Sequence, residues 1–202
     1  MNTIIITGPS GSGKTFLANK LSIVLENSIV INTDSYYRDN FFIKLISLFI
    51  HDIYDRFISI KEAELIKTIE SIYNNENQIT IYNYDFRNKK SLKSILNKTN
   101  NTQFLIVEGI FSHRININYI NAIKLLCLEE QAICFQRRLN RDESERGRNR
   151  NEVIKRFRKS WEIFFKHSAS YRNSNKVYII NPSNKISYKE LIDKIIIKNK
   201  NP

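Results

Sequence analysis

Eight residues near the start of the chain have the types and the spacing needed to hold a row of phosphates. A glycine, four residues, a second glycine, a lysine and a threonine follow one another in Gly8-Pro9-Ser10-Gly11-Ser12-Gly13-Lys14-Thr15. Glycines let consecutive backbone N–H groups point inward at phosphate oxygens. In such loops the lysine neutralises the β- and γ-phosphates and the threonine hydroxyl binds Mg²⁺. We therefore expect this segment to bind ATP or GTP with Mg²⁺, and Lys14 to stabilise the transferred phosphoryl group.

The use of glycine supports a ligand-binding loop over an ordinary glycine-rich turn. The chain has 5 glycines, and Gly8, Gly11 and Gly13 lie in this one segment. A β-branched run at Thr3–Thr7 precedes the segment, and apolar residues at helical spacing follow at Thr15–Leu25. A strand, a loop and a helix in this order bring the positive N-terminal end of the helix to the phosphates.

Phosphoryl transfer to an alcohol also needs a carboxylate that can accept the hydroxyl proton. Asp34 and Glu108 each come immediately after an apolar run of strand length. Groups at the carboxyl ends of parallel strands face a common crevice. We interpret Asp34 as the catalytic base. The structural alternatives are a helix N-cap or turn carboxylate for Asp34 and a strand-end salt bridge for Glu108.

Arginines are concentrated in the segment 137–158, which contains eight of them. Arginine's planar fork suits phosphate oxygens, and spacings of three or four place several forks on one helical face. We interpret the segment as a lid that closes over a triphosphate. Two alternatives remain: a nucleic-acid-binding stripe, or a solvated helix in which the arginines alternate with acids. Those acids are Asp142, Glu143, Glu145 and Glu152.

The elements that must position these groups alternate between strand and helix. Further strands are predicted at Ser28–Asn32, Gln78–Tyr82, Phe104–Val107, Lys124–Leu128 and Lys176–Ile180. Further helices are predicted at Lys61–Tyr73, Gln131–Leu139, Glu152–Lys166 and about Tyr188–Lys198. This alternation indicates an α/β fold of the P-loop NTPase type, a three-layer sandwich with a parallel sheet covered by helices on both faces. We expect residues 1–202 to form one domain.

Composition limits the class of protein. The chain carries 32 Lys and Arg against 20 Asp and Glu, a net charge of +12 that attracts polyanions without choosing between nucleotides and nucleic acid. Cys127 and Cys134 are the only cysteines and are predicted to be reduced core thiols. The three histidines lack metal-ligand spacing, so no zinc site is expected. We expect neither a membrane span nor a signal peptide, and therefore a cytoplasmic protein.

Taken together, these segments resemble the uridine kinase family, within the group that includes the phosphoribulokinases. The resemblance covers nearly the whole chain. Beyond residues 8–15 it rests on Asp34-Ser35-Tyr36-Tyr37, Tyr84-Asp85-Phe86, Val107-Glu108-Gly109-Ile110 and Arg137 through Arg148. The arginine segment is the most distinctive of these matches.

The resemblance implies roles that local patterns do not. It makes Asp34 the catalytic base and places Thr15, Asp34 and Glu108 around Mg²⁺. It assigns Arg141 and Arg146 to the triphosphate. On the acceptor side it implies a contact for each of Asp52, Tyr84, Arg138 and Arg148.

Two departures from the family pattern concern the acceptor. Lys89 stands where the family presents a histidine to the pyrimidine, and Phe41–Ile50 is more apolar and shorter than expected of an acceptor loop. The leading interpretation is a kinase that phosphorylates the 5′-hydroxyl of uridine, with cytidine as a second substrate. The alternatives are a P-loop kinase of nicotinamide riboside, pantothenate or a sugar phosphate, and a nucleotide- or RNA-binding protein without turnover. Both a monomer and a homo-oligomer are compatible with the sequence.

Overall fold

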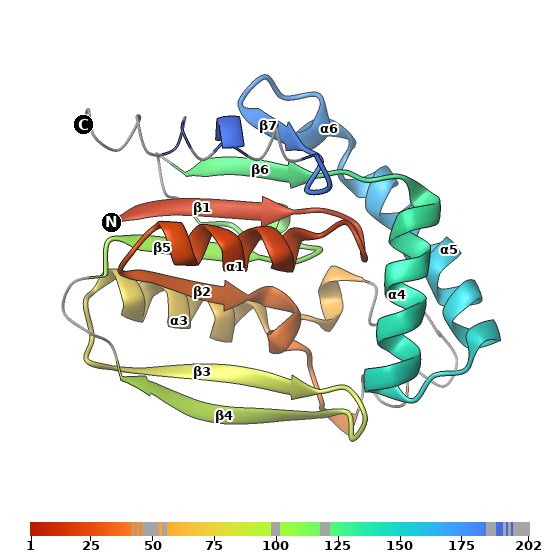
Figure 1. Cartoon of the computed structure of the whole chain (residues 1–202). Helices are drawn as coiled ribbons and strands as arrows, with labels where there is room; N and C mark the ends of the chain where they lie inside the picture. Colours follow the sequence, from red (N-terminus) through yellow and green to blue (C-terminus); the bar gives the residue numbers. More distant parts are fainter. Residues whose placement is uncertain are drawn as a thin grey trace.

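Five parallel strands form the central sheet of the computed structural model (Figure 1). The structure describes residues 1–41, 43, 45, 53, 56–97, 102–117, 122–184, 189–191, 193 and 195. The strands are β1 (Asn2–Thr7), β2 (Ser28–Asn32), β5 (Phe104–Glu108), β6 (Ile123–Cys127) and β7 (Val177–Ile180). They lie in the order β2-β5-β1-β6-β7. The predicted α/β fold with a parallel sheet is confirmed.

Both faces of the sheet are buried, which explains why its central strands are continuous apolar runs. On one face, α1 (Lys14–Val24) packs Leu17 and Leu21 against Ile4 and Ile106. Leu191 and Ile195 join this cluster from the C-terminal segment, which is helical at its described residues. On the other face, α3 (Glu62–Tyr73) packs its buried apolar residues in one cluster with Ile31 of β2 and Leu105 of β5. The helix α5 (Arg150–His167) contributes Phe164 to this cluster. The fold therefore has the three layers expected from the sequence.

A separate antiparallel hairpin was not predicted. β3 (Gln78–Asp85) pairs with β4 (Lys90–Asn97), and neither strand joins the parallel sheet (Figure 1). The expectation that the strand at Gln78 belongs to the parallel sheet is therefore wrong. The turn Phe86–Lys89 joins two adjacent strands directly, whereas a parallel pair needs a crossover of a dozen residues or more. β4 escaped prediction because most of its side chains are exposed, so it lacks a strong apolar alternation.

The arginine-rich segment folds into two consecutive helices. α4 (Gln131–Arg146) continues seven residues beyond the predicted end at Leu139 and stops at Gly147, whose φ of 63° is left-handed. α5 then packs against α4, and the short α6 (Ala169–Arg172) follows. Three 3₁₀ turns complete the described elements: η1 (Thr33–Tyr36), η3 (Phe57–Ser59) and η4 (Ser112–Arg114).

Two further predictions concern the core and the membrane. Cys127 and Cys134 are buried free thiols, as predicted. Among the described residues, no helix combines the length and the apolar character needed to cross a membrane.

Candidate active site

Three adjacent strands end at one edge of the sheet, and each leads to a group singled out in the sequence. β1 leads into the glycine loop, β5 ends at Glu108, and β2 leads through Asn32 to Asp34. The strand register pairs Glu108 with Ile6 of β1 and with Asn32 of β2. We call residues 8–15, Asp34 and Glu108 the phosphate end of the site. Its geometry follows from parallel pairing, which aligns the carboxyl ends of the strands.

The glycine loop is shaped by its own backbone and by the helix above it. Gly11 has a φ of 87°, and a Cβ at this position would collide with the backbone of Cys134 in α4. Lys14 is buried, and its Nζ donates a hydrogen bond of 3.4 Å to the Pro9 carbonyl. Arg141 Nη2 donates to Ser10 Oγ at 3.2 Å. The loop therefore has the expected strand–loop–helix form, with α4 close enough to bring arginines to bound phosphates.

Glu108 lies beside Thr15 at the start of α1. Thr15 Oγ1 donates to Glu108 Oε1 at 3.0 Å, while the buried Oε2 has no hydrogen-bond partner among the described residues. Burial raises the pKa of Glu108 to about 7; the nearby Asp34 adds to the rise and Lys14 opposes it. An unpartnered buried carboxylate oxygen favours a cation.

This donor set fits Mg²⁺. Mg²⁺ is typically bound through one or two carboxylates, with phosphates and waters as the other ligands. Within the described part of the chain, no three or more His, Cys, Asp or Glu side chains gather as a metal site. Thr15, Glu108 and Asp34 are the residues that would hold the ion, so a bound triphosphate would have to complete its coordination.

Asp34 is held so that its carboxylate faces the site. Its backbone N–H donates to Asn32 Oδ1 at 2.8 Å, so Asn32 and not Asp34 caps the 3₁₀ turn η1. Ile110 N lies 3.4 Å from Asp34 Oδ1 as a weak donor. Gly109 has a φ of 153°, and a Cβ there would collide with the Thr33 hydroxyl. The close approach of the two strand ends thus requires glycine, and the N-cap alternative for Asp34 is wrong.

A cavity of about 270 Å³ opens beside the phosphate end. Ser10 and Asp34 line one side of it, and the hairpin lines another. From the hairpin come Tyr84, Phe86, Arg87 and Lys89; from the end of α4 and the following turn come Arg138, Arg141, Arg146, Gly147 and Arg148. The cavity therefore brings together predicted phosphate-side and acceptor-side residues.

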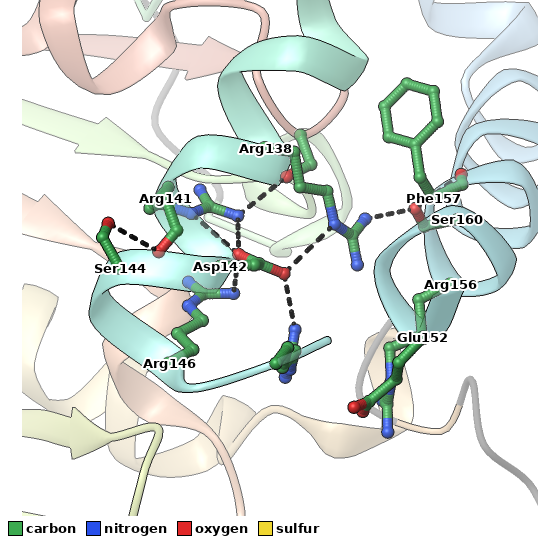
Figure 2. A network of polar contacts seen from close by, with 11 residues as sticks. Arg138, Arg141, Asp142, Ser144, Arg146, Glu152, Arg156, Phe157 and Ser160 are labelled. Atoms are coloured by element: carbon green, nitrogen blue, oxygen red, sulfur yellow. Dashed lines mark hydrogen bonds and ion pairs between the residues drawn. The ribbon is translucent and has the colours of Figure 1, made fainter. Parts of the chain in front are cut away.

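Four arginines surround one aspartate on the α4 side of the cavity. We call this set the Asp142 cluster (Figure 2). Asp142 is fully buried, and its carboxylate forms ion pairs with Arg138 at 3.6 Å, Arg141 at 3.0 Å, Arg146 at 3.3 Å and Arg148 at 2.7 Å. Arg138 also donates to Ser160 of α5 at 2.5 Å. The carboxylate thus fixes four guanidinium groups around one point.

The Asp142 cluster keeps a surplus of positive charge. Four guanidinium charges against one carboxylate leave +3. Burial by itself would raise the pKa of Asp142, but the four arginines outweigh burial and hold the pKa below its usual value. Burial and the neighbouring Arg141 lower the pKa of Arg146 to about 10, so Arg146 remains protonated at neutral pH. Such a surplus beside the glycine loop favours a polyanionic ligand.

The hairpin supplies an aromatic wall. The ring of Tyr84 lies 5.4 Å from that of Tyr37 and 5.1 Å from that of Phe86. The Arg146 guanidinium lies 3.7 Å from the centre of the Phe86 ring. Lys89 is exposed in the hairpin turn with a φ of 50°. An aromatic wall with a few polar groups is typical of a pocket for a small organic molecule.

Comparisons with known proteins agree with this geometry. Residues 3–174 match the model of the phosphoribulokinase / uridine kinase family. The chain belongs to this family. A uridine kinase from Borrelia duttonii is 35% identical over 159 residues, which cover 75% of this chain and 72% of the relative. A uridine kinase from Ureaplasma parvum is 28% identical over 195 residues, 91% of this chain and 90% of the relative.

Solved structures show the same fold. A possible uridine kinase from Bacillus stearothermophilus superposes with a TM-score of 0.56, at 17% identity and with 88% of each chain covered. The resemblance to this family noted in the sequence is confirmed, and the protein is a kinase.

The structure gathers most of the predicted site residues of this kinase in one place. The glycine loop, Thr15, Asp34 and Glu108 form the phosphate end, while the hairpin and α4 bring the others to the cavity. Asp52 lies outside the described residues, as does most of Phe41–Ile50. The alternative of a solvated arginine helix is wrong for Asp142, which is fully buried.

Two features of the kinase site were missed in the sequence. Asp142 was named only as an intervening acid, although its i,i+4 relation to Arg138 and Arg146 is visible in the sequence. Arg87 was not singled out at all, because its contacts lie with α4, 57 and 58 residues further along the chain. No local pattern reports contacts of that separation.

Proposed function

We propose that this kinase transfers the γ-phosphate of ATP to the 5′-hydroxyl of uridine, with cytidine as a weaker acceptor. The observation that carries the proposal is the cavity in which Asp34 lies between the glycine loop and the aromatic hairpin wall. A nucleoside lying against Tyr84 and Phe86 would direct its sugar toward Asp34. The uridine kinases among the relatives support this choice of acceptor.

The residues divide the work of the transfer. Asp34 accepts the proton of the 5′-hydroxyl while that oxygen forms its bond to the γ-phosphorus, and the bond to the β-phosphate oxygen breaks to release ADP. Lys14, Arg141 and Arg146 stabilise the charge on the transferred group. Residues 8–13 hold the phosphates through their backbone N–H groups. When bound by Thr15, Glu108 and Asp34, Mg²⁺ would neutralise phosphate charge.

Acceptor contacts belong to the other side of the cavity. Tyr84, Lys89, Arg138 and Arg148 would contact the nucleoside, and Asp52 would hold the ribose hydroxyls. The segment 137–158 would act as the lid that excludes water from the phosphates. We further propose that the enzyme works in the cytoplasm, where it would salvage pyrimidine nucleosides.

A panel of acceptors tests the proposal. The enzyme is supplied with ATP and Mg²⁺ and, separately, with uridine, cytidine, nicotinamide riboside, pantothenate or a sugar phosphate. ADP release is measured, and each product is identified by mass spectrometry. We expect uridine monophosphate as the main product. Faster turnover of a non-pyrimidine acceptor would replace the proposed substrate, and binding of ATP without turnover on any acceptor would contradict the reaction.

A further inference from the structure

Arg87 in the hairpin turn grips the end of α4. Its Nε donates to the Glu145 carbonyl at 2.7 Å, and its Nη2 donates to the Ser144 carbonyl at 2.9 Å. The planar fork of arginine matches two neighbouring acceptors, which a lysine ammonium cannot do in the same way. The contact therefore ties the tip of one element to the end of another that lies far away in sequence.

The two acceptors are carbonyls that the helix itself leaves open. The last four carbonyls of an α-helix lack N–H partners within the helix. At this end the N–H groups of both Gly147 and Arg148 turn back to the Asp142 carbonyl, so they do not reach Ser144 or Glu145. A cation at a helix C-terminus is also favoured by the helix dipole. Arg87 thus completes the C-terminal cap of α4 from outside the helix.

Hydrogen bonds within the hairpin turn hold Arg87 in place for this contact. Asp85 Oδ1 accepts the backbone N–H groups of Arg87 and Asn88, each at 2.9 Å, and Asp85 Oδ2 accepts Asn88 Nδ2 at 2.6 Å. Next to Arg87, the Phe86 ring lies against Arg146, a member of the Asp142 cluster. The turn therefore contacts the end of α4 in two ways. Arg87 binds the backbone carbonyls of Ser144 and Glu145, and Phe86 packs against the side chain of Arg146.

The grip joins the two walls of the cavity. Tyr84 and Lys89 line it from the hairpin, and Arg146 and Arg148 line it from the end of α4. The hydrogen bonds of Arg87 and the contact of Phe86 with Arg146 link the two walls, so a ligand that orders one wall acts on the other through them. Thermodynamic linkage makes such an effect reciprocal for binding.

We propose that Arg87 is a positioning residue that couples the hairpin wall of the cavity, with Tyr84 and Lys89, to the arginines of the Asp142 cluster, so that nucleoside and triphosphate bind cooperatively. The inference rests on the proposed function for the identity of the nucleoside, but not for the coupling between the walls. Because Arg87 is exposed, the coupling is modest, about three- to tenfold in affinity.

Hydrogen exchange tests the coupling without any acceptor. The unliganded enzyme is compared with the enzyme saturated with a non-hydrolysable ATP analogue and Mg²⁺. In the wild type we expect the analogue to slow exchange at the backbone amides of Arg87 and Asn88. In Arg87→Ala this slowing should disappear, while Arg87→Lys should retain only part of it. Lys90→Ala is the matched control, since Lys90 is an exposed cation on the same hairpin and is not among the described residues lining the cavity.

Calorimetry then measures the cooperativity itself. The dissociation constant of uridine is determined with and without the analogue, and we expect a ratio of about three to ten in the wild type and in Lys90→Ala, and about one in Arg87→Ala. An unchanged ratio in Arg87→Ala, or equal exchange at the turn with and without the analogue in the wild type, overturns the inference. If uridine does not bind at all while the exchange effect persists, the proposed acceptor fails and the coupling stands.

Discussion

The phosphate end of the site and the two cavity walls formed by the hairpin and the end of α4 are built in different ways. Lys14, Asp34 and Glu108 are fixed by the main chain, because they leave or follow adjacent strands of one sheet in register. The hairpin and the end of α4 are held by side chains. Asp142 forms ion pairs with four arginines, and Arg87 joins the hairpin to α4. The glycine loop and the two carboxylates are thus held by the main chain, whereas the arginines and the hairpin are held by side-chain contacts that single substitutions can change.

The largest loss is expected from Lys14→Ala at the phosphate end. One buried ammonium on the transferred phosphate contributes several kcal/mol to the transition state, so turnover should fall by about a thousandfold or more. The fold should survive, because strand pairing and not Lys14 shapes this end. Steady-state ADP release measures the effect, and circular dichroism verifies folding. Lys20→Ala, on the exposed side of the same helix, serves as control. Turnover within tenfold of the wild type would remove Lys14 from the phosphates.

Asp34→Asn should act on the chemical step alone. The amide keeps the shape of the side chain but cannot accept the hydroxyl proton, so kcat should fall by roughly a hundredfold or more while the KM for the nucleoside changes little. Initial rates over a range of uridine concentrations separate the two constants. A change confined to KM would make Asp34 a binding residue, and the phosphate end would then no longer differ from the cavity walls in this respect.

Asp142→Asn should affect stability as well as activity. Removing one partner of a buried ion pair is strongly destabilising, but three of the four arginines are partly exposed, so we expect a loss of about 2 kcal/mol, or roughly 4 to 8 °C in Tm. The affinity for ATP should also change, because the four guanidinium groups lose the carboxylate with which they all pair. Thermal melts and nucleotide titrations measure the two effects. Equal Tm values at neutral pH would mean that Asp142 does not anchor the arginines.

The same variant has a defined pH dependence. The pKa of Asp142 is lowered in the folded state, so its contribution is complete above the ordinary aspartate pKa of 3.8 and is lost as the pH falls through the lower folded pKa. The difference in Tm between wild type and Asp142→Asn should therefore be constant near neutrality and should shrink in acid below about pH 4. A difference that grows on acidification contradicts this assignment.

The smallest effect is expected from Lys89 in the hairpin wall of the cavity. A lysine can only donate, so it suits the acceptor oxygen of uracil and opposes the amino group of cytosine. Uridine should therefore exceed cytidine in kcat/KM by about fivefold, the lower end of the range for an unpaired donor, because Lys89 is exposed. Lys89→His should narrow the gap, and Lys89→Ala should lower uridine activity more than cytidine activity. Equal use of the two nucleosides by the wild type places Lys89 outside the acceptor contacts.

The difference between the phosphate end and the cavity walls also explains which parts of the site could be predicted from the sequence. The glycine loop, Asp34 and Glu108 could be located because short apolar runs mark the strands that carry them, and parallel pairing fixes the rest. The hairpin strand β4 could not, since its exposed side chains leave no apolar pattern. The hydrogen bond from Arg87 to the Glu145 carbonyl could not be predicted either, because it depends on how the hairpin and α4 pack together. The i,i+4 spacing predicts that Asp142 lies next to Arg138 and Arg146. Its complete burial could not be predicted from the sequence.

The shared carboxylate of Asp142 has a consequence for how mutations combine. The four arginines share one carboxylate, with Arg141 and Arg146 at Oδ1 and Arg138 and Arg148 at Oδ2, so the loss of one arginine frees the carboxylate to rearrange around the other three. Substitutions of residues in one ion-pair network are not additive. Paired changes within the cluster should therefore cost less, or more, than the sum of the single changes. The four arginines form one mutational unit, in which the effect of an exchange at any position depends on the residues already present at the others.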